Sequence, residues 1–128
     1  MKIVGMIARY LLGLVFLVFG LNIYLQFLPA PPPPPGPLGQ YMTALMTTHY
    51  IWFVGVFQVV PALLLLINRY VPLALALLAP VIVNIDLTHI LMAPSGLPIA
   101  ALVTIFWILV FLRVRSAFSG LFQARVAD

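Results

Sequence analysis

The side chains that could best take part in a reaction lie in one apolar stretch of this 128-residue chain. Asp86 lies there and is the only acidic residue apart from the C-terminal Asp128. His89 follows it and Asn84 precedes it. A carboxyl group is costly to place in hydrocarbon, so an acid within a membrane span is by default a functional-site hypothesis. Residues three apart share a helix face, which makes Asp86 and His89 the candidate catalytic pair.

Two chemistries fit this pair. In the first, Asp86 and His89 take up and release protons beside a quinone headgroup, because quinol oxidation releases protons. In the second, His49 joins them in a metal site of two histidines and one carboxylate. Those ligands come from two separate segments, and we expect no metal. A structural alternative remains, in which Asp86 is a neutral carboxylic acid that bonds to Asn22 and joins two helices.

The composition indicates that the bilayer is the solvent for this chain. Apolar residues make up 65 % and charged residues 6 %, whereas a soluble domain carries about 25 % charge. The net charge of +4 comes from scattered residues that form no stripe for nucleic acid. The chain has no cysteine, which excludes disulfides, thiolate metal sites and cysteine redox chemistry. A redox role would therefore need a bound quinone, a metal with N and O ligands, or a cofactor of a partner.

Four apolar segments are long enough to cross a membrane, which takes about 20 residues in a helix. The expected spans are residues 7–28, 50–68, 71–92 and 97–115. A proline-rich loop at 29–39 should form an extended polyproline II spacer; a PxxP ligand for another protein is the alternative. A cleaved signal peptide is the alternative for the first segment, although its apolar part would be only about 7–15 residues long. The fold expected is one all-α domain, an integral membrane four-helix bundle.

The basic residues indicate how the bundle is oriented. All of them fall at one side of a four-span topology: Lys2, Arg9, Arg69, Arg113, Arg115 and Arg125. The positive-inside rule makes that side cytoplasmic. Both termini should therefore be inside, with the proline-rich loop outside.

Polar residues should gather toward the outer side. A rise of about 1.5 Å per residue gives similar depths to Asn22, Gln26, His49, Asn84, Asp86 and His89, with Gln58 nearer the middle. Asn22 and Gln26 are four apart and should share a helix face. These residues are the candidate ligand-binding layer. Gly13 and Gly20 should let a neighbouring helix approach closely.

Four stretches carry a resemblance to a known family: residues 9–22 (RYLLGLVFLVFGLN), 54–58 (VGVFQ), 63–75 (LLLLINRYVPLAL) and 80–89 (PVIVNIDLTH). With these the chain resembles the DoxX family, in particular its short DoxX-like members. The resemblance implies a four-span protein of the bacterial inner membrane, linked to quinone-dependent respiratory oxidoreductase complexes. Relatives often carry an acid where this chain has Gln58, and an apolar residue where it has Asp86.

Three functions follow as hypotheses. The first is a non-catalytic subunit of a larger membrane redox complex, respiratory or photosynthetic, which is not an enzyme on its own. The second is a quinone-linked oxidoreductase component in which Asp86 and His89 handle protons. The third is a small membrane transporter. The expected partners are the lipid bilayer and other integral membrane subunits or a second copy, with no nucleic acid. No covalent cofactor is expected; a quinone or a lipid is the candidate ligand.

Overall fold

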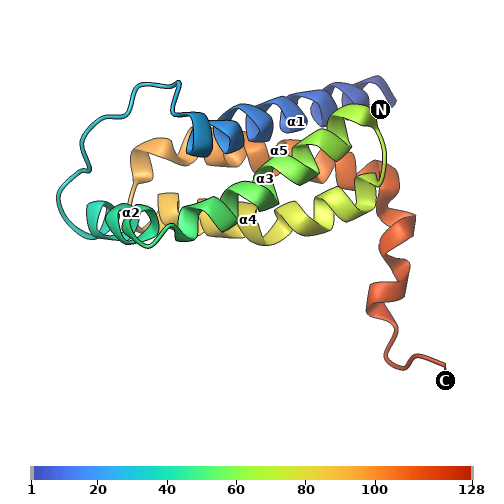
Figure 1. The fold of residues 1–128 in the computed structure, drawn as a ribbon. Coiled ribbons are helices and arrows are strands. Elements are labelled where there is room, and N and C mark those ends of the chain that lie inside the picture. Colours follow the sequence, from blue (N-terminus) through green and yellow to red (C-terminus); the bar gives the residue numbers. More distant parts are fainter. Residues whose placement is uncertain (1, 128) are drawn as a thin grey trace.

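Four long helices run side by side in this computed structural model, which describes residues 2–127. They are α1 (Lys2–Leu25), α3 (Tyr50–Ile67), α4 (Val71–Leu91) and α5 (Leu97–Val114). Shorter elements connect or follow them: α2 (Pro37–Thr47) and the 3-10 helices η1 (Pro94–Gly96) and η2 (Arg115–Phe122) (Figure 1). The described residues contain no strand. The expected all-α four-helix bundle is confirmed.

The long helices match the thickness of a bilayer. Each is long and apolar enough to cross a membrane. At a rise of 1.5 Å per residue, helices of 18–24 residues extend about 27–36 Å, against a hydrocarbon core of about 30 Å. The chain is therefore a multi-pass membrane protein. The first span differs from its expected range of 7–28, because the helix begins at Lys2 and ends at Leu25.

Glycines bring α1 and α3 together. A Cβ added to Gly13 would lie 3.2 Å from the carbonyl oxygen of Ala62, and one added to Gly20 would lie 2.8 Å from Val59 Cγ2. Gly55 of α3 in turn packs against the ring of Tyr24. The close helix approach expected at Gly13 and Gly20 is confirmed. Because the neighbour is α3 of the same chain, these glycines stabilise the bundle rather than an interface with another subunit.

The bundle has an apolar centre and an apolar outside. The centre is formed by buried side chains from all four long helices: Leu12, Phe16, Ala62, Leu65, Ala74, Leu75, Leu78, Ile82, Val103 and Val110. Many other large apolar side chains are exposed on the outer faces. The indole nitrogen of Trp107 donates to the carbonyl oxygen of Leu75 at 3.0 Å, which joins α5 to α4. Exposed apolar faces of this extent suit contact with lipid tails or membrane partners.

The start of α1 and the end of α5 lie at the same end of the bundle (Figure 1). The guanidinium of Arg113 donates to the carbonyl oxygen of Lys2 at 3.3 Å, and the Arg113 side chain packs against Gly5. The turn between α3 and α4, which carries Arg69, lies at this end too (Figure 1). The two terminal segments therefore emerge on one side, together with the basic residues; we call this the basic end.

Arg9 does not flank the first span as the sequence suggested. It is only 7 % exposed, and its guanidinium donates to the carbonyl oxygen of Leu65 in the last turn of α3. The guanidinium carbon also lies 4.3 Å from the centre of the Tyr10 ring. The C-terminus of a helix carries partial negative charge, which stabilises a cation there. Arg9 thus joins α1 to α3 inside the bundle.

The opposite end of the bundle, the outer end, begins where α1 stops. Gln26 has a left-handed backbone with φ 52°, and the Asn22 side-chain oxygen accepts from the Leu28 amide at 2.8 Å. An extended strap of residues 27–36 follows and leads into α2 (Figure 1). Pro37 is the first residue of α2, since proline is tolerated in a first helical turn. The proline-rich loop therefore ends before residue 39, where we had expected its end.

Candidate functional site

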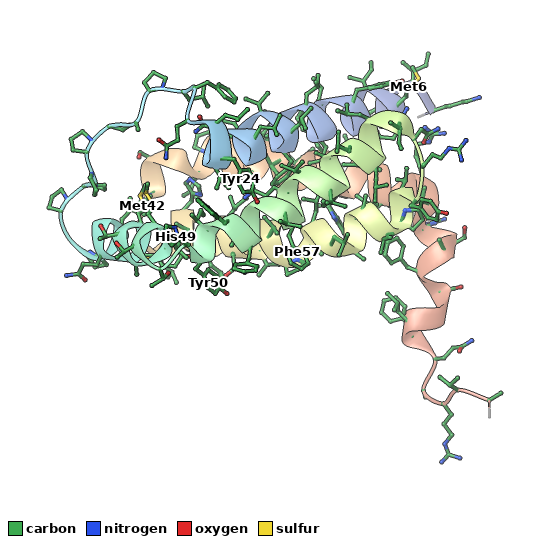
Figure 2. The ribbon with its side chains drawn as sticks, viewed as in Figure 1. Met6, Tyr24, Met42, His49, Tyr50 and Phe57 are labelled. Atoms are coloured by element: carbon green, nitrogen blue, oxygen red, sulfur yellow. The ribbon has the colours of Figure 1, made fainter. Side chains whose placement is uncertain are left out.

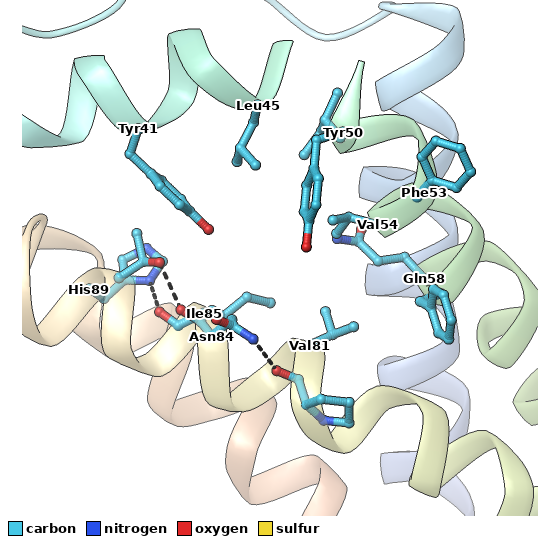
Figure 3. Close-up of a pocket in the computed structure, with 14 residues that line it drawn as sticks. Tyr41, Leu45, Tyr50, Phe53, Val54, Gln58, Val81, Asn84, Ile85 and His89 are labelled. Carbon is cyan, nitrogen blue, oxygen red and sulfur yellow. Dashed lines mark hydrogen bonds between the residues drawn. The ribbon is translucent and has the colours of Figure 1, made fainter. Parts of the chain in front are cut away.

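A cavity of about 500 Å³ lies between α2, α3 and α4 at the outer end of the bundle (Figure 3). Helix α2 contributes Tyr41 and Leu45, and α3 contributes the side chains from Tyr50 to Gln58 that face α4. The third wall is the stretch of α4 from Pro80 to His89. A left-handed residue between α2 and α3, His49 with φ 60°, separates the two helices. The chain can therefore change direction there, and α2 lies across from α4 (Figure 3).

Each polar side chain of α4 that lines the cavity forms a hydrogen bond to a backbone carbonyl of its own helix. The Asn84 amide nitrogen donates to the carbonyl oxygen of Pro80 at 2.8 Å. The Thr88 hydroxyl donates to the backbone carbonyl oxygen of Asn84 at 2.7 Å. His89 Nδ1 lies 2.8 Å from the backbone carbonyl oxygen of Ile85. A carbonyl oxygen only accepts, so Nδ1 carries a hydrogen in this arrangement. The amide oxygen of Asn84 keeps its capacity to accept a hydrogen bond from a ligand.

Two tyrosine hydroxyls extend into the cavity from the side opposite α4. Tyr41 and Tyr50 both point toward the turn of α4 that carries Asn84 (Figure 3). Within residues 2–127 neither hydroxyl, nor the side-chain amide of Gln58, forms a hydrogen bond. The cavity therefore offers hydroxyl and amide groups of three helices to a ligand placed between them.

The rest of the cavity is apolar and uncharged. Its described lining includes no Asp, Glu, Lys or Arg, and its walls are formed by Leu45, Phe53, Val54, Val81 and Ile85. Phe53 is 72 % exposed, so the cavity has a side opening on the surface of the bundle. A mainly apolar site with a few converging polar groups is typical of a small-molecule site. The ligand that fits is uncharged, largely apolar and able to form hydrogen bonds at one end.

Asp86 faces away from this cavity, toward α5. The Thr104 hydroxyl donates to its carboxyl group, with Oγ1 3.0 Å from Oδ1 and 2.8 Å from Oδ2. The same hydroxyl oxygen lies 2.9 Å from the carbonyl oxygen of Ala100. The expected partners of Asp86 were Asn22 or His89, and the structure gives Thr104 in their place. The carboxyl group joins α4 to α5.

His89 likewise is not paired with Asp86. One edge of its ring binds the carbonyl of Ile85, and the other edge lies against Gly96 of η1. A Cβ at Gly96 would lie 2.0 Å from His89 Cδ2 and 2.4 Å from Nε2. The ring is therefore held between its own helix and the following turn, although part of it lines the cavity.

The remaining residues of the expected polar layer lie apart from the cavity lining. The side chain of Asn22 caps the turn after α1. Gln26 is exposed beyond the end of that helix, so these two do not share a helix face as expected. His49 is exposed and packs on Trp52, with ring centres 5.0 Å apart. The cavity thus receives Gln58, Asn84 and His89 from the expected set.

A metal site built from His49, His89 and Asp86 has no counterpart in the structure. Residues 2–127 contain no group of three histidine, cysteine or acidic side chains that could hold a metal ion. The three side chains have separate neighbours: Trp52 for His49, Gly96 for His89 and Thr104 for Asp86.

Sequence reasoning missed Thr104 and the two cavity tyrosines. Thr104 is the only hydroxyl-bearing residue of α5, and this isolated polar residue was a usable signal for a partner of Asp86. Tyr41 and Tyr50 had no comparable signal, because their place depends on the change of direction at His49. Tyrosines near a membrane surface more often form part of an aromatic belt.

No protein-family model matches this chain, and neither the curated proteins nor the solved structures contain a match to it.

Proposed function

We propose that this chain is a DoxX-like, non-catalytic subunit of a larger redox complex in the bacterial inner membrane. The observation that supports the proposal is that the ionisable side chains inside the bundle form bonds between helices of the chain. Asp86 joins α4 to α5 through Thr104, and Arg9 joins α1 to α3. Both groups stabilise contacts between helices, which is the role expected of ionisable groups in a non-catalytic subunit.

The outer faces of the helices support the same role. Large apolar side chains are exposed on α3 and α5, among them Val56, Leu63, Leu102, Ile105 and Ile108. Such faces suit other membrane subunits, a second copy or lipid. By the positive-inside rule the basic end faces the cytoplasm, and the cavity then lies toward the outer side of the membrane.

Gentle solubilisation followed by identification of the co-purifying chains tests this proposal. We expect an assembly that contains redox subunits. The exposed α5 residues are the ones to vary, because changes at Gly13 or Gly20 would disturb the bundle itself. Ile105→Trp should release the chain from the assembly while the isolated chain stays folded, with Ile3→Trp, at an exposed position on α1, as the matched control. Recovery of the unaltered chain as a partner-free, monodisperse protein would contradict the proposal.

The cavity favours a second candidate function, the binding of a quinone headgroup. The hydroxyls of Tyr41 and Tyr50 can donate to a quinone carbonyl oxygen, and the amide oxygen of Asn84 can accept from a quinol hydroxyl. The apolar walls and the side opening suit a ring and tail that enter from the bilayer. Asp86 has no part in this version, because it faces α5.

Titration of the purified protein with a short-chain quinone tests the second candidate. Removing one hydrogen bond, in Tyr50→Phe, should weaken binding by about fivefold, since a neutral hydrogen bond contributes about 1 kcal/mol. Tyr10→Phe, outside the cavity, is the matched control and should bind as the unaltered protein does. Equal affinity for Tyr50→Phe and the control would exclude this cavity as the quinone site. Loss of binding in Asp86→Asn would instead favour the proton-handling hypothesis.

A further inference from the structure

The C-terminal segment leaves the bundle at the basic end. Helix α5 ends at Val114, and η2 carries the chain away in a direction across the long helices (Figure 1). If the long helices cross the membrane, η2 runs along its surface. The basic residues that flank the spans place this surface at the level of the lipid headgroups. The segment is therefore positioned as an interfacial helix would be.

The side chains of this segment are divided between the bundle and the outside. Phe118 is buried, and its ring centre lies 5.2 Å from that of Phe111 in α5. Leu121 is 73 % exposed, Phe122 85 % and Val126 78 %. No described part of the chain covers these three apolar side chains. Figure 2 shows the C-terminal segment extending away from the four long helices.

The charge around the segment is mainly positive. The exposed basic residues at this end are Lys2, Arg69, Arg113, Arg115 and Arg125. The only acid among residues 2–127 is Asp86, which lies inside the bundle against Thr104. An apolar strip with flanking arginines, at an end of the bundle where basic residues outnumber acids, is complementary to a negatively charged lipid surface.

We propose that residues 115–126 bind the surface of an anionic leaflet. Leu121 and Phe122 insert at the boundary between headgroups and acyl chains, while Arg115 and Arg125 contact lipid phosphates. This anchor would hold the basic end of the bundle at a fixed depth. It is independent of the proposed redox role, because it involves neither the cavity nor the outer face of α5.

Single cysteines provide the test, since the chain has none of its own. In a 3-10 helix, residues three apart share a face. Phe118 and Leu121 share one face, and Ala117 lies on another. We would attach a spin label to Leu121→Cys and, as the matched control, to Ala117→Cys. Each variant is reconstituted in full-length protein, in vesicles of phosphatidylcholine alone or mixed equally with phosphatidylglycerol. The readout is accessibility of the label to oxygen and to a water-soluble nickel complex.

In the mixed vesicles the label at 121 should be accessible to oxygen and protected from nickel, while the label at 117 stays accessible to nickel. Changing Arg115→Gln and Arg125→Gln should lower the bound fraction of the segment by up to about fivefold per arginine. In vesicles of pure phosphatidylcholine the bound fraction of the unsubstituted segment should fall in the same way. The labelled variants should keep the helix content of the unaltered protein, because the changed residues are exposed.

Three outcomes would overturn the proposal. One is equal nickel accessibility at 121 and 117 in mixed vesicles, which places the segment in water. Another is an immobilised label at 121 whose protection is the same in both lipids, which indicates docking on protein, such as a second copy. The third is recovery of protection in pure phosphatidylcholine on adding inorganic phosphate, which would make a free anion rather than a lipid surface the partner.

Discussion

Helix α4 carries polar side chains on two faces, and the two faces differ in chemistry. Toward the cavity it presents Asn84, Thr88 and His89, and each of these side chains bonds to a backbone carbonyl of its own helix. Toward α5 it presents Asp86, which bonds to Thr104 of another helix. A polar group that bonds within its own helix remains open to a ligand on its far side. A group whose partner is on a neighbouring helix contributes instead to packing.

This difference changes which residue is the functional candidate. The acid was the most conspicuous residue in the sequence, yet it lies on the packing face. The less conspicuous Asn84 and Gln58 line the cavity, together with tyrosines from α2 and α3. Substitutions on the two faces should therefore affect different properties: stability on the α5 face and ligand affinity on the cavity face.

The largest effect is expected from Asp86→Arg on the α5 face. A guanidinium cannot accept the hydrogen bond of Thr104, and forcing the larger arginine side chain between α4 and α5 should overpack this contact by up to about 3 kcal/mol. The free energy of unfolding, measured by denaturant titration in mild detergent, should fall by about that amount. Asp86→Asn keeps an acceptor for Thr104 and serves as the control, with little change. If Asp86→Arg changed the free energy of unfolding as little as Asp86→Asn does, the assignment of a packing role to this face would be wrong.

A second effect should appear where η1 meets the cavity face. In Gly96→Ala the new Cβ would lie 2.0 Å from His89 Cδ2, so the ring must move and lose its bond to Ile85. Overpacking of this kind lowers stability by about 2 kcal/mol. Gly120→Ala is the matched control, because no atom lies within 4 Å of its added Cβ. Thermal unfolding monitored by circular dichroism should separate the two variants, and equal midpoints would show that His89 is not held by this contact.

Asn84→Leu should affect ligand binding and leave folding unchanged. The Asn84 side chain is exposed and bonds only to Pro80 of its own helix, so its loss removes no tie between helices. The short-chain quinone should bind about fivefold more weakly, as expected for one lost hydrogen bond. The unfolding midpoint provides the internal control. A fall in stability with unchanged affinity would reverse the assignment of the two faces.

The smallest effect is expected for Thr104→Val. Hydrogen bonds between membrane helices contribute about 0.6 kcal/mol on average, so the free energy of unfolding should fall by roughly that amount. Quinone affinity should stay the same, since Thr104 is outside the cavity lining. Thr88→Val is the comparison, because the Thr88 hydroxyl bonds to its own helix and lines the cavity. A loss of affinity in Thr104→Val would mean that the α5 face communicates with the ligand.

The four long helices followed from the apolar runs along the sequence. Four apolar runs of about 20 residues can satisfy their backbone hydrogen bonds in a bilayer only as helices. Their expected bounds agree closely with α3, α4 and α5, and differ at α1, where the helix starts five residues earlier than residue 7 and ends at Leu25. The grouping of the basic residues at one end also followed from their positions between spans.

Which polar side chains meet was decided by tertiary structure. Depth along a helix can be counted from the sequence, but the direction of a side chain around the helix axis matters as much. Asp86 and His89 have similar depths and different neighbours, because the rotation of α4 directs the acid toward Thr104. The cavity likewise depends on the left-handed His49 between α2 and α3, which lets α2 lie across from α4. The sequence by itself thus determined the membrane-spanning helices, through the hydrophobicity and length of its apolar segments. The packing of those helices determined the site, because only their mutual rotation and the path of α2 bring Tyr41, Tyr50 and Asn84 around one cavity.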